Sequence, residues 1–405
     1  MSTNSPSHVN ESRLSLHMSL ELSSTTWKLG FADQVGRRVR VRSVASGDFA
    51  ALTTEIQAAK QAFGLDDEAT VVSCYEAGRD AFWVHRCLVS MGIESHVVEP
   101  SSIEVNRKRR RAKTDRIDAQ KILNALLRFK SGDRFACRMI RIPDAESEDM
   151  RNLNREMRTI KTEKTAHVNR IRSLLTAQGI TEVKFNRDFP AFLDQAHSAD
   201  GRPLMDALKE RLQREFDRLV LAVEQIRQLQ MQLANLMRSA AATKANHSAD
   251  PQVSRQAEVA SRLNELVGIG PVTSWTLATE VFSWRDIKNR RQLGALAGLT
   301  PTPHASGAEE KEQGISKSGR GEIRVLMIEI AWGWLKFQPQ SDLAQWYRTN
   351  YGAGTRRSRK VGIVALARKL LVALGKYIRG GEIPPHAHLR EELKFNYLAS
   401  LTPVI

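Results

Sequence analysis

The order of strand and helix patterns in the first third of the chain is the feature that most limits its fold. From 14 to 23, apolar residues alternate with polar ones, which is the pattern of a β-strand with one buried face. The segments TWKLGFAD and RRVRVRSV follow after short connections, and with the first strand they predict a three-stranded antiparallel meander. The patterns then predict a helix in DFAALTTEIQAAKQAFG, a strand in ATVVSCY, a helix in DAFWVHRCLVSMG, a strand in ESHVVEP and a helix in DRIDAQKILNALLRF.

This β-β-β-α-β-α-β-α order is that of the ribonuclease H architecture, and four acidic residues occupy the places where that α/β architecture carries its carboxylates. Glu21 lies in the first strand, Glu76 at the end of the fourth, and Asp115 and Asp118 one turn apart in the last helix. Each acid alone also fits a solvated surface carboxylate, but carboxylates that converge repel one another unless a cation lies between them. Oxygen ligands suit Mg²⁺ or Mn²⁺. The sequence thus predicts a divalent metal site, in which two ions ~4 Å apart would clamp the attacking and leaving oxygens of a phosphodiester.

The charge of the chain favours a polyanionic partner. In 405 residues, 61 Lys and Arg face 45 Asp and Glu, for a formal net charge of +16, and this excess points to nucleic acid. An anionic membrane surface is the rival, but the sequence has no apolar run of membrane-spanning length and no signal-peptide pattern at its polar start. We therefore expect a cytoplasmic protein with no membrane partner. The three cysteines are too scattered for a disulfide framework or a zinc site.

A dense basic run stands directly before the aspartate pair. A solvated charge run or a localisation tag is the alternative, but beside metal-binding carboxylates we favour contact with phosphate. The residues expected to bind nucleic acid here are Arg107, Lys108, Arg109, Arg110, Arg111 and Lys113.

Between about 145 and 240 the strand patterns stop, and long helical periodicity predicts a helical arm. A coiled-coil seam is predicted in its second helix, with apolar residues at alternating spacings of four and three that are interrupted only by Gln230. The seam consists of Leu212, Phe216, Leu219, Val223, Ile226, Leu233 and Met237. It would close on the first helix of the arm or on a second subunit, and the pattern leaves both open.

The C-terminal part is predicted to be mainly α-helical and to begin with a helix-hairpin-helix element. In LVGIGPVTS, a turn at Gly268 and Gly270 would present backbone N–H groups to a phosphate without reading bases. The alternative is an ordinary helical hairpin in which these glycines allow tight packing.

A loop rich in Gly, Pro and Ser is predicted farther on, in GLTPTPHASGAEEKEQGISKSGRGEIR. It carries Ser306, Ser316 and Ser318, and its cations Lys317, Arg320 and Arg324 are expected to contact nucleic acid. Serines in such loops are usually turn formers. An activated serine needs a base or a metal beside it, and since the loop has no obvious base, activation would come from the distant carboxylate site.

Taken as an ordered set, five segments resemble the DEDD-type insertion-sequence transposases, relatives of the Piv DNA invertase. They are SLELSSTTWKLGF, VVSCYEAGRDAFWVHRCL, KTDRIDAQKI, LVGIGPVTSWTLATEV and LAGLTPTPHASG with GISKSGRGEIR, and the resemblance covers roughly residues 14 to 380. It implies a RuvC-like N-terminal domain with an Asp-Glu-Asp-Asp metal site, a coiled-coil arm and a C-terminal domain with a nucleophilic serine.

The motifs of this family match particular residues of the chain. Glu76 in YEAGRD and Asp115 and Asp118 in KTDRIDA match the family's acids, while Ser306 matches the nucleophile, with Ser316 in reserve. Where the family usually has Asp in the first strand, this chain has Glu21. The Glu side chain still supplies carboxylate oxygens, but it is longer by a methylene group, which affects the spacing of the metals.

The resemblance implies a DNA transposase or recombinase of the bacterial nucleoid that acts as a homo-oligomer, either dimer or tetramer. Because some members of the family are guided by a structured RNA, we expect a structured guide RNA as a partner of this chain as well. Two alternatives stand beside it: a structure-specific nuclease that uses metal-activated water without a covalent intermediate, and a non-catalytic nucleic-acid-binding protein. The expected organisation is a disordered tail at 1–13, the RuvC-like domain at 14–145, the arm at 146–240, a linker at 241–256, the serine transposase domain at 257–385 and a C-terminal tail at 386–405.

Overall fold

The computed structural model describes residues 15–34, 39–78, 81–103, 115–245, 254–306 and 309–390. The chain forms two compact units, Met1–Pro143 and Asp144–Ile405. The predicted helical arm thus belongs to the same unit as the C-terminal helices.

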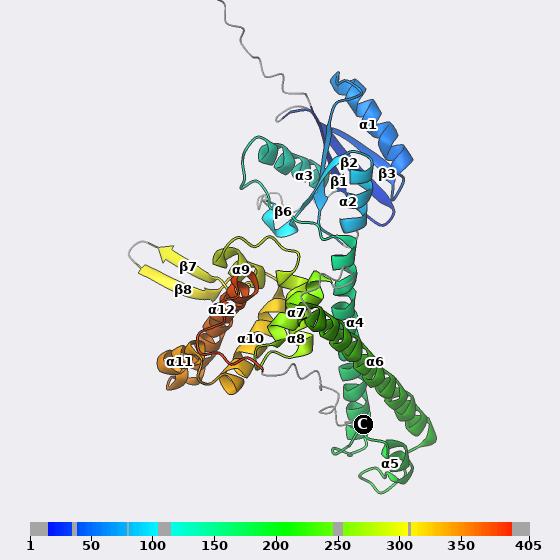
Figure 1. Ribbon diagram of the computed structural model, residues 1–405. Helices are drawn as coiled ribbons and strands as arrows, with labels where there is room; N and C mark the ends of the chain where they lie inside the picture. Colours follow the sequence, from blue (N-terminus) through cyan, green and yellow to red (C-terminus); the bar gives the residue numbers. More distant parts are fainter. Residues whose placement is uncertain are drawn as a thin grey trace, which may run out of the picture. The chain divides into compact units, whose positions relative to one another are not determined.

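The first unit is built on a mixed six-stranded sheet of order β3-β2-β1-β4-β5-β6 (Figure 1). Its strands are β1 (Leu16–Glu21), β2 (Thr26–Ala32), β3 (Arg40–Ala45), β4 (Val71–Glu76), β5 (Glu94–Val98) and β6 (Met139–Ile140). Its helices are α1 (Phe49–Phe63), α2 (Ala81–Ser90), the 3₁₀ turn η1 (Pro100–Ser102) and α3 (Asp115–Lys130). The first three strands form the predicted antiparallel meander, and β1 pairs in parallel with β4. Apart from η1 and the short edge strand β6, the element order is the predicted one.

The alternation of side chains along β1 and β4 divides the sheet into two differently covered faces. Leu16, Met18 and Leu20 point to the face that packs against α1 and α2, where Leu52 and Leu88 complete the core. The opposite face is covered by α3, which packs on β1, β2 and β4. Residues at odd positions of β1 and at even positions of β4 therefore face α3.

Close packing holds α3 against the sheet. The buried Ser19 hydroxyl donates a hydrogen bond of 2.7 Å to the Ala119 carbonyl, and the Cys74 thiol donates one of 3.5 Å to the Ile122 carbonyl. Gly30 lies across from Ser19 in β2. A methyl group on Gly30 would come within 2.7 Å of the Ser19 oxygen, so the absence of a side chain allows this approach.

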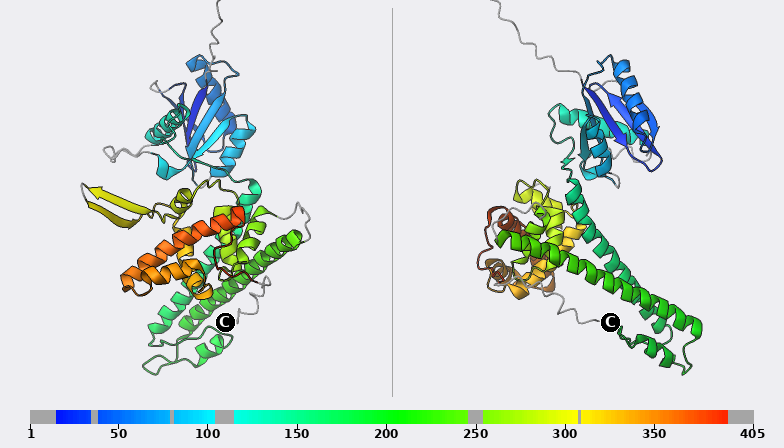
Figure 2. Two further views of the ribbon diagram at one scale, coloured as in Figure 1. Left: turned by 60° about the vertical axis from the view of Figure 1, so that its left-hand side comes forward. Right: turned by 45° about the vertical axis from the view of Figure 1, so that its right-hand side comes forward.

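The second unit begins with an antiparallel pair of long helices, α4 (Ala145–Thr176) and α6 (Asp206–Ala245), with the short helix α5 (Phe189–Gln195) near the end at which the chain turns (Figure 2). Two apolar clusters lie along the pair. In one, Ile171 and Leu175 of α4 contact Phe216, and in the other Met157 lies with Leu233. The apolar seam predicted for the arm thus packs on α4 of the same chain.

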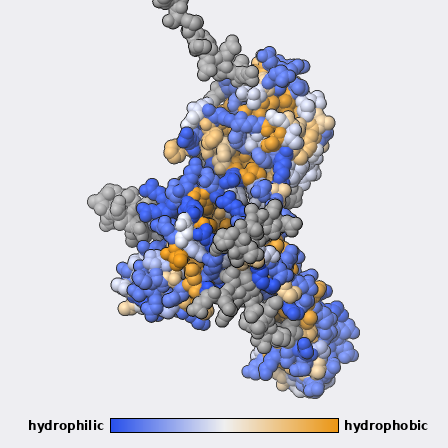
Figure 3. All heavy atoms as spheres, in the orientation of Figure 1, coloured by the Kyte–Doolittle hydropathy of each residue, from blue (hydrophilic) through white to orange (hydrophobic). Residues whose placement is uncertain are grey.

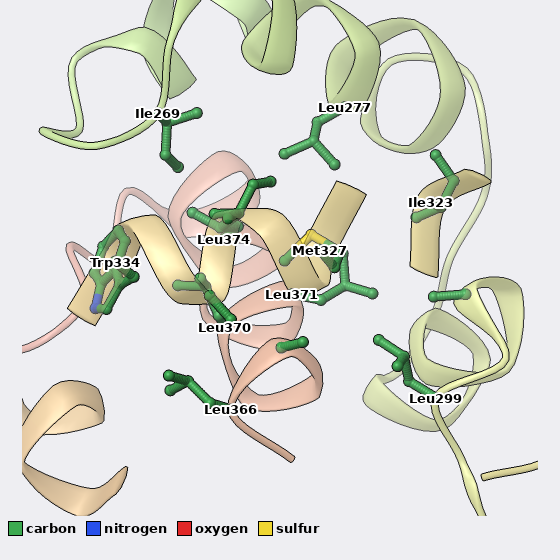
Figure 4. Packing of buried hydrophobic residues seen from close by; sticks show 14 of the residues in the cluster. Ile269, Leu277, Leu299, Ile323, Met327, Trp334, Leu366, Leu370, Leu371 and Leu374 are labelled. Carbon is green, nitrogen blue, oxygen red and sulfur yellow. The ribbon is translucent and has the colours of Figure 1, made fainter. Parts of the chain in front are cut away.

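The remaining elements form a helical body around a large apolar cluster (Figure 4). In chain order they are α7 (Arg255–Asn264), α8 (Pro271–Leu277), the π-helix η3 (Ala278–Phe282), α9 (Arg290–Ala297), β7 (Pro301–Ser306), β8 (Glu309–Ile315), α10 (Gly321–Phe337), α11 (Asp342–Tyr347), the π-helix η4 (Arg348–Gly352) and α12 (Arg356–Gly380). Met327 and Trp334 of α10 contribute to this cluster, as do Leu370 and Leu371 of α12. Where the sequence predicts only a loop, β7 and β8 form a two-stranded hairpin. None of the helices in the described residues is both long and apolar enough to cross a bilayer.

The contact between Gly30 and Ser19 can be tested by substitution. We expect Gly30→Ala to lower the free energy of unfolding of the first unit by about 1–3 kcal/mol, because the added methyl group overfills a buried site. Thermal and urea unfolding of the full chain would measure the loss. In Ser19→Ala/Gly30→Ala the clashing oxygen is gone, so the double variant should lose less stability than the sum of the two single variants; strictly additive losses would contradict this explanation.

Candidate active site

Glu21 and Glu76 end two neighbouring parallel strands. The register pairs Leu20 of β1 with Tyr75 of β4, so the next residue on each strand is one of these acids. By the alternation of side chains, Glu21 follows Ser19 and Glu76 follows Cys74 on the face covered by α3. A cavity of about 400 Å³ opens here and is lined by Glu21, Leu22, Ser23, Ser24, Glu76, Ala77 and Gly78. The strand pairing therefore brings two of the four predicted acids together.

The direction of α3 brings a third acid to the same end of the sheet. Ala119 contacts Ser19 and Ile122 contacts Cys74, while Leu127 lies near Ala32, which pairs with the beginning of β1. Because α3 runs from the carboxyl ends of β1 and β4 toward their starts, its first turn, Asp115–Asp118, lies at the end of the sheet where Glu21 and Glu76 are found.

Asp118 is partly exposed, and its carboxylate accepts a hydrogen bond of 2.6 Å from the Lys121 ammonium one turn later. The side chain of Asp115 is outside the described residues. Among the residues that are described, no three His, Cys, Asp or Glu side chains gather closely enough to hold a metal ion. The donors at this edge of the sheet are nevertheless carboxylate and hydroxyl oxygens, the ligands preferred by Mg²⁺ and Mn²⁺.

The basic run predicted to contact nucleic acid in the first unit precedes α3. Its cations lie outside the described residues; they are Arg107, Lys108, Arg109, Arg110, Arg111 and Lys113.

The Gly268 turn joins α7 to α8, as a helical hairpin requires, and packing explains one of its two glycines. Gly268 has φ +93°, and a methyl group there would come within 3.1 Å of Phe337. The backbone N–H of Val267 donates to the His388 carbonyl and the Arg390 guanidinium to the Ile269 carbonyl. Gly270 begins α8 and has open space around it.

The candidate serines lie on the β7–β8 hairpin and at its base. Ser306 ends β7 and pairs with Glu309, and its side chain is outside the described residues. The Ser316 hydroxyl, just after β8, accepts hydrogen bonds from Thr300 at 3.0 Å and from Ser318 at 3.3 Å. Ser306 therefore lies within the hairpin, at the end of β7, whereas Ser316 lies just beyond its second strand.

The segment after Ser318 is fixed by very close backbone packing. A methyl group on Gly319 would come within 2.3 Å of the Ala295 carbonyl oxygen and of the Gly298 nitrogen. Arg324 donates a hydrogen bond of 3.4 Å to the Ala297 carbonyl. Lys317 is exposed and has a positive φ of 57°. Of the predicted phosphate-binding cations in this segment, Lys317 is thus the most accessible.

A buried carboxylate that sequence reasoning missed holds this segment to the arm. Glu280 in η3 is 4% exposed and forms ion pairs with Arg151 of α4, at 3.2 Å, and with Arg320. Burial alone would raise the pKa of Glu280, but Arg320 and Arg151 outweigh it and hold the pKa below its ordinary value. The only signal in the sequence is an acid within the otherwise uncharged stretch LATEVF.

The sheet order and the acids at its edge define a ribonuclease H-like domain, joined here to a helical unit that carries serines on a hairpin. Sequence comparisons agree. A model of the DEDD transposases of IS110 type matches residues 28–179, and a model of the transposase IS116/IS110/IS902 family matches residues 260–345. The chain belongs to this IS116/IS110/IS902 family of transposases, and its substrate is DNA.

Two similar proteins extend the comparison. The putative transposase y4rJ of Sinorhizobium fredii is 40% identical over 375 residues, which cover 91% of this chain and 93% of the relative. The transposase for insertion sequence element IS1111A of Coxiella burnetii is 27% identical over 247 residues, 61% of each chain. The similarity to y4rJ extends through both units.

Replacement of Glu280 tests the buried ion pairs. Glu280→Gln leaves Arg151 buried without its partner charge, and we expect a loss of about 3–5 kcal/mol in the free energy of unfolding at neutral pH. Since the folded pKa of Glu280 is lowered, its stabilisation is present above the unfolded pKa of about 4.5 and disappears as the pH falls through the folded value. Urea unfolding from pH 7 to pH 3 should therefore find the gap between wild type and variant narrowing below about pH 4.5.

Glu322 supplies the matched control. It is half-exposed and forms ion pairs with Arg158 and Arg320. Glu322→Gln should cost less than about 1 kcal/mol. An equal loss in both variants would mean that burial of Glu280 is not what makes it important.

Proposed function

We propose that this transposase cuts and rejoins DNA through two groups in different units: a Mg²⁺ or Mn²⁺ site held by Glu21, Glu76, Asp115 and Asp118, and a nucleophilic serine, Ser306. The observation that carries the proposal is the meeting of Glu21 and Glu76 at the carboxyl ends of β1 and β4, beneath the first turn of α3. Bound divalent ions would supply a Lewis acid that stabilises charge on the phosphate oxygens.

The carboxylates and the serine would have separate tasks. Glu21, Glu76 and the aspartate pair would bind the metal and orient it. Lys121, which donates to Asp118 in the structure, would yield this carboxylate to the metal. The Ser306 hydroxyl would lose its proton, and its oxygen would form a bond to phosphorus as one P–O bond of the DNA backbone breaks. The departing oxygen would take up a proton in turn, so that no net proton is gained or lost. The energy of the phosphoester is thereby kept for rejoining.

Two simpler functions compete with this proposal. A nuclease that uses metal-activated water would need the acids but no serine. A binding protein without catalysis would need neither, and the Glu at position 21, where Asp is usual in the family, is the feature that favours it. The family membership of the chain favours a DNA-cutting enzyme over this last function.

Removal of the serine separates strand transfer from hydrolysis. We expect Ser306→Ala to abolish a covalent protein–DNA adduct and to reduce strand exchange by roughly 10³-fold or more, since the proposed nucleophilic oxygen is removed. Denaturing gels with labelled DNA and mass spectrometry of the adduct would measure both. Ser316→Ala is the matched control and should keep the adduct. Continued cutting by Ser306→Ala would identify a hydrolytic nuclease, and an adduct lost only in Ser316→Ala would make Ser316 the nucleophile.

Removal of an acid tests the metal site. We expect Asp118→Ala to weaken Mn²⁺ binding and to slow DNA cutting by roughly 10²-fold or more, because charge stabilisation on the phosphate is lost. Calorimetric titration with Mn²⁺ gives the binding, and Asp133→Ala, an acid at the other end of α3, provides the control. Unchanged DNA processing by Asp118→Ala would contradict the carboxylate mechanism.

We further propose that the active form is a homo-oligomer guided by a structured RNA. The support is the net charge of +16 and the separation of acids and serine into two units, which allows subunits to share a site. Sequencing of RNA that copurifies with the protein, with the mass of the complex in solution, addresses both points. A monomer free of RNA that completes strand exchange would refute them.

A further inference from the structure

A long groove follows α12 in the second unit. Its volume is about 1040 Å³, and its walls come from α12, from α11 and the start of α9, and from the base of the β7–β8 hairpin. Residues of α12 from Arg357 to Lys376 line it, a length of about 28 Å at the helical rise per residue. An extended occupant would match this shape better than a compact small molecule.

The lining combines an apolar floor with cationic edges. Among the described residues that line the groove are seven Arg and Lys but only a single acid, Asp342. Along α12 the apolar residues Val361, Val364 and Val372 recur at helical spacing between the cations. Val361 is 56% exposed, although a valine on a helix that packs in a core is ordinarily covered. Figure 3 shows apolar surface bordered by hydrophilic surface over this part of the second unit.

An aromatic side chain lies in the same groove. Trp346 of α11 is part of the lining, as is Tyr351, whose ring meets it edge to face at 5.6 Å between centroids. The Lys369 ammonium lies 4.5 Å from the centroid of the Trp346 ring. Positive charge therefore lies over a face of the ring, and a base that stacks on this face would take the place of Lys369.

We propose that this groove holds a single strand of the DNA substrate, with its bases against Trp346 and the valines and its phosphates between the Arg and Lys side chains. Proteins that bind single strands use this combination of aromatic stacking and a basic groove. A duplex keeps its bases stacked inside and offers phosphates alone to such a floor. The inference rests on DNA as the substrate but not on Ser306 as the nucleophile.

The position of the groove fits a strand that is about to be cut or rejoined. The groove is lined by residues from both strands of the hairpin near its base. Leu299 lies just before β7 and Pro301 begins it, while Gly314 and Ile315 end β8. A strand lying along α12 would thus reach the base of the hairpin that carries Ser306 and the loop at Ser316.

Fluorescence anisotropy of the full chain with a labelled oligothymidylate, and with a duplex of the same length, tests the proposal. Trp346→Ala should weaken single-strand binding about 5- to 150-fold, the effect of losing a stacked base, with little change for the duplex. Lys360→Ala should lower the slope of log affinity against log salt by roughly 0.7, as expected for one lost phosphate contact to a single strand. Arg211→Ala serves as the control, because Arg211 is an exposed cation of α6 outside the groove. It should change neither the single-strand affinity nor the slope of log affinity against log salt.

Each other outcome rejects the proposal. Equal losses for duplex and single strand would reduce the groove to a general basic surface. A selective loss for an oligouridylate of the same length would assign the groove to RNA. Unchanged DNA binding with a changed oligomeric mass would assign it to a second copy of the chain. Because Lys360 is exposed, its variant keeps the test valid even if Trp346→Ala is poorly folded. The assay measures binding without cutting, so its failure is distinct from failure of the adduct experiment.

Discussion

The parallel pairing of β1 with β4 is the constraint on which the candidate active site depends. Parallel strands end at the same edge of a sheet, and so this pairing places Glu21 beside Glu76 although a meander and a long helix separate them in sequence. The hydrogen bonds of Ser19 and Cys74 to α3 then fix the helix across the same face. Packed backbone therefore positions these elements, which matters because carboxylates brought together would repel one another.

In the second unit the like charges that lie close together are two guanidinium groups, and a carboxylate separates them. Arg151 and Arg320 would repel each other, and the buried Arg151 would be costly without a partner, but Glu280 forms an ion pair with both. Their positions join the first helix of the arm, a π-helix and the segment that follows the candidate serines. A movement of α4 would consequently shift Arg320, which follows the hairpin, because Glu280 is paired with both Arg151 and Arg320.

The sequence was sufficient for the N-terminal fold because each element there has a clear period. Alternation marks β1, and an apolar run marks the buried β4, so the element order and the ends of the strands that carry Glu21 and Glu76 could be predicted. The β7–β8 hairpin was missed because Pro301 and Pro303 argue against a strand, although a two-stranded hairpin has only edges and tolerates them. Glu280 was missed for a different reason: its partners are 129 and 40 residues away in sequence, and no local pattern records such a contact. The groove along α12 could not be inferred either, since its cations and valines look like an ordinary amphipathic helix until α11 and the hairpin are placed beside it.

Gly319 has a consequence for how this protein can change over time. The carbonyl of Ala295 and the amide of Gly298 come so near that even the smallest side chain would force the chain apart at this point. A single substitution that adds a side chain at position 319 is therefore excluded unless the neighbouring backbone moves as well. The residues around this contact can change, but the point at which the β7–β8 hairpin joins α10 is fixed by the glycine at position 319.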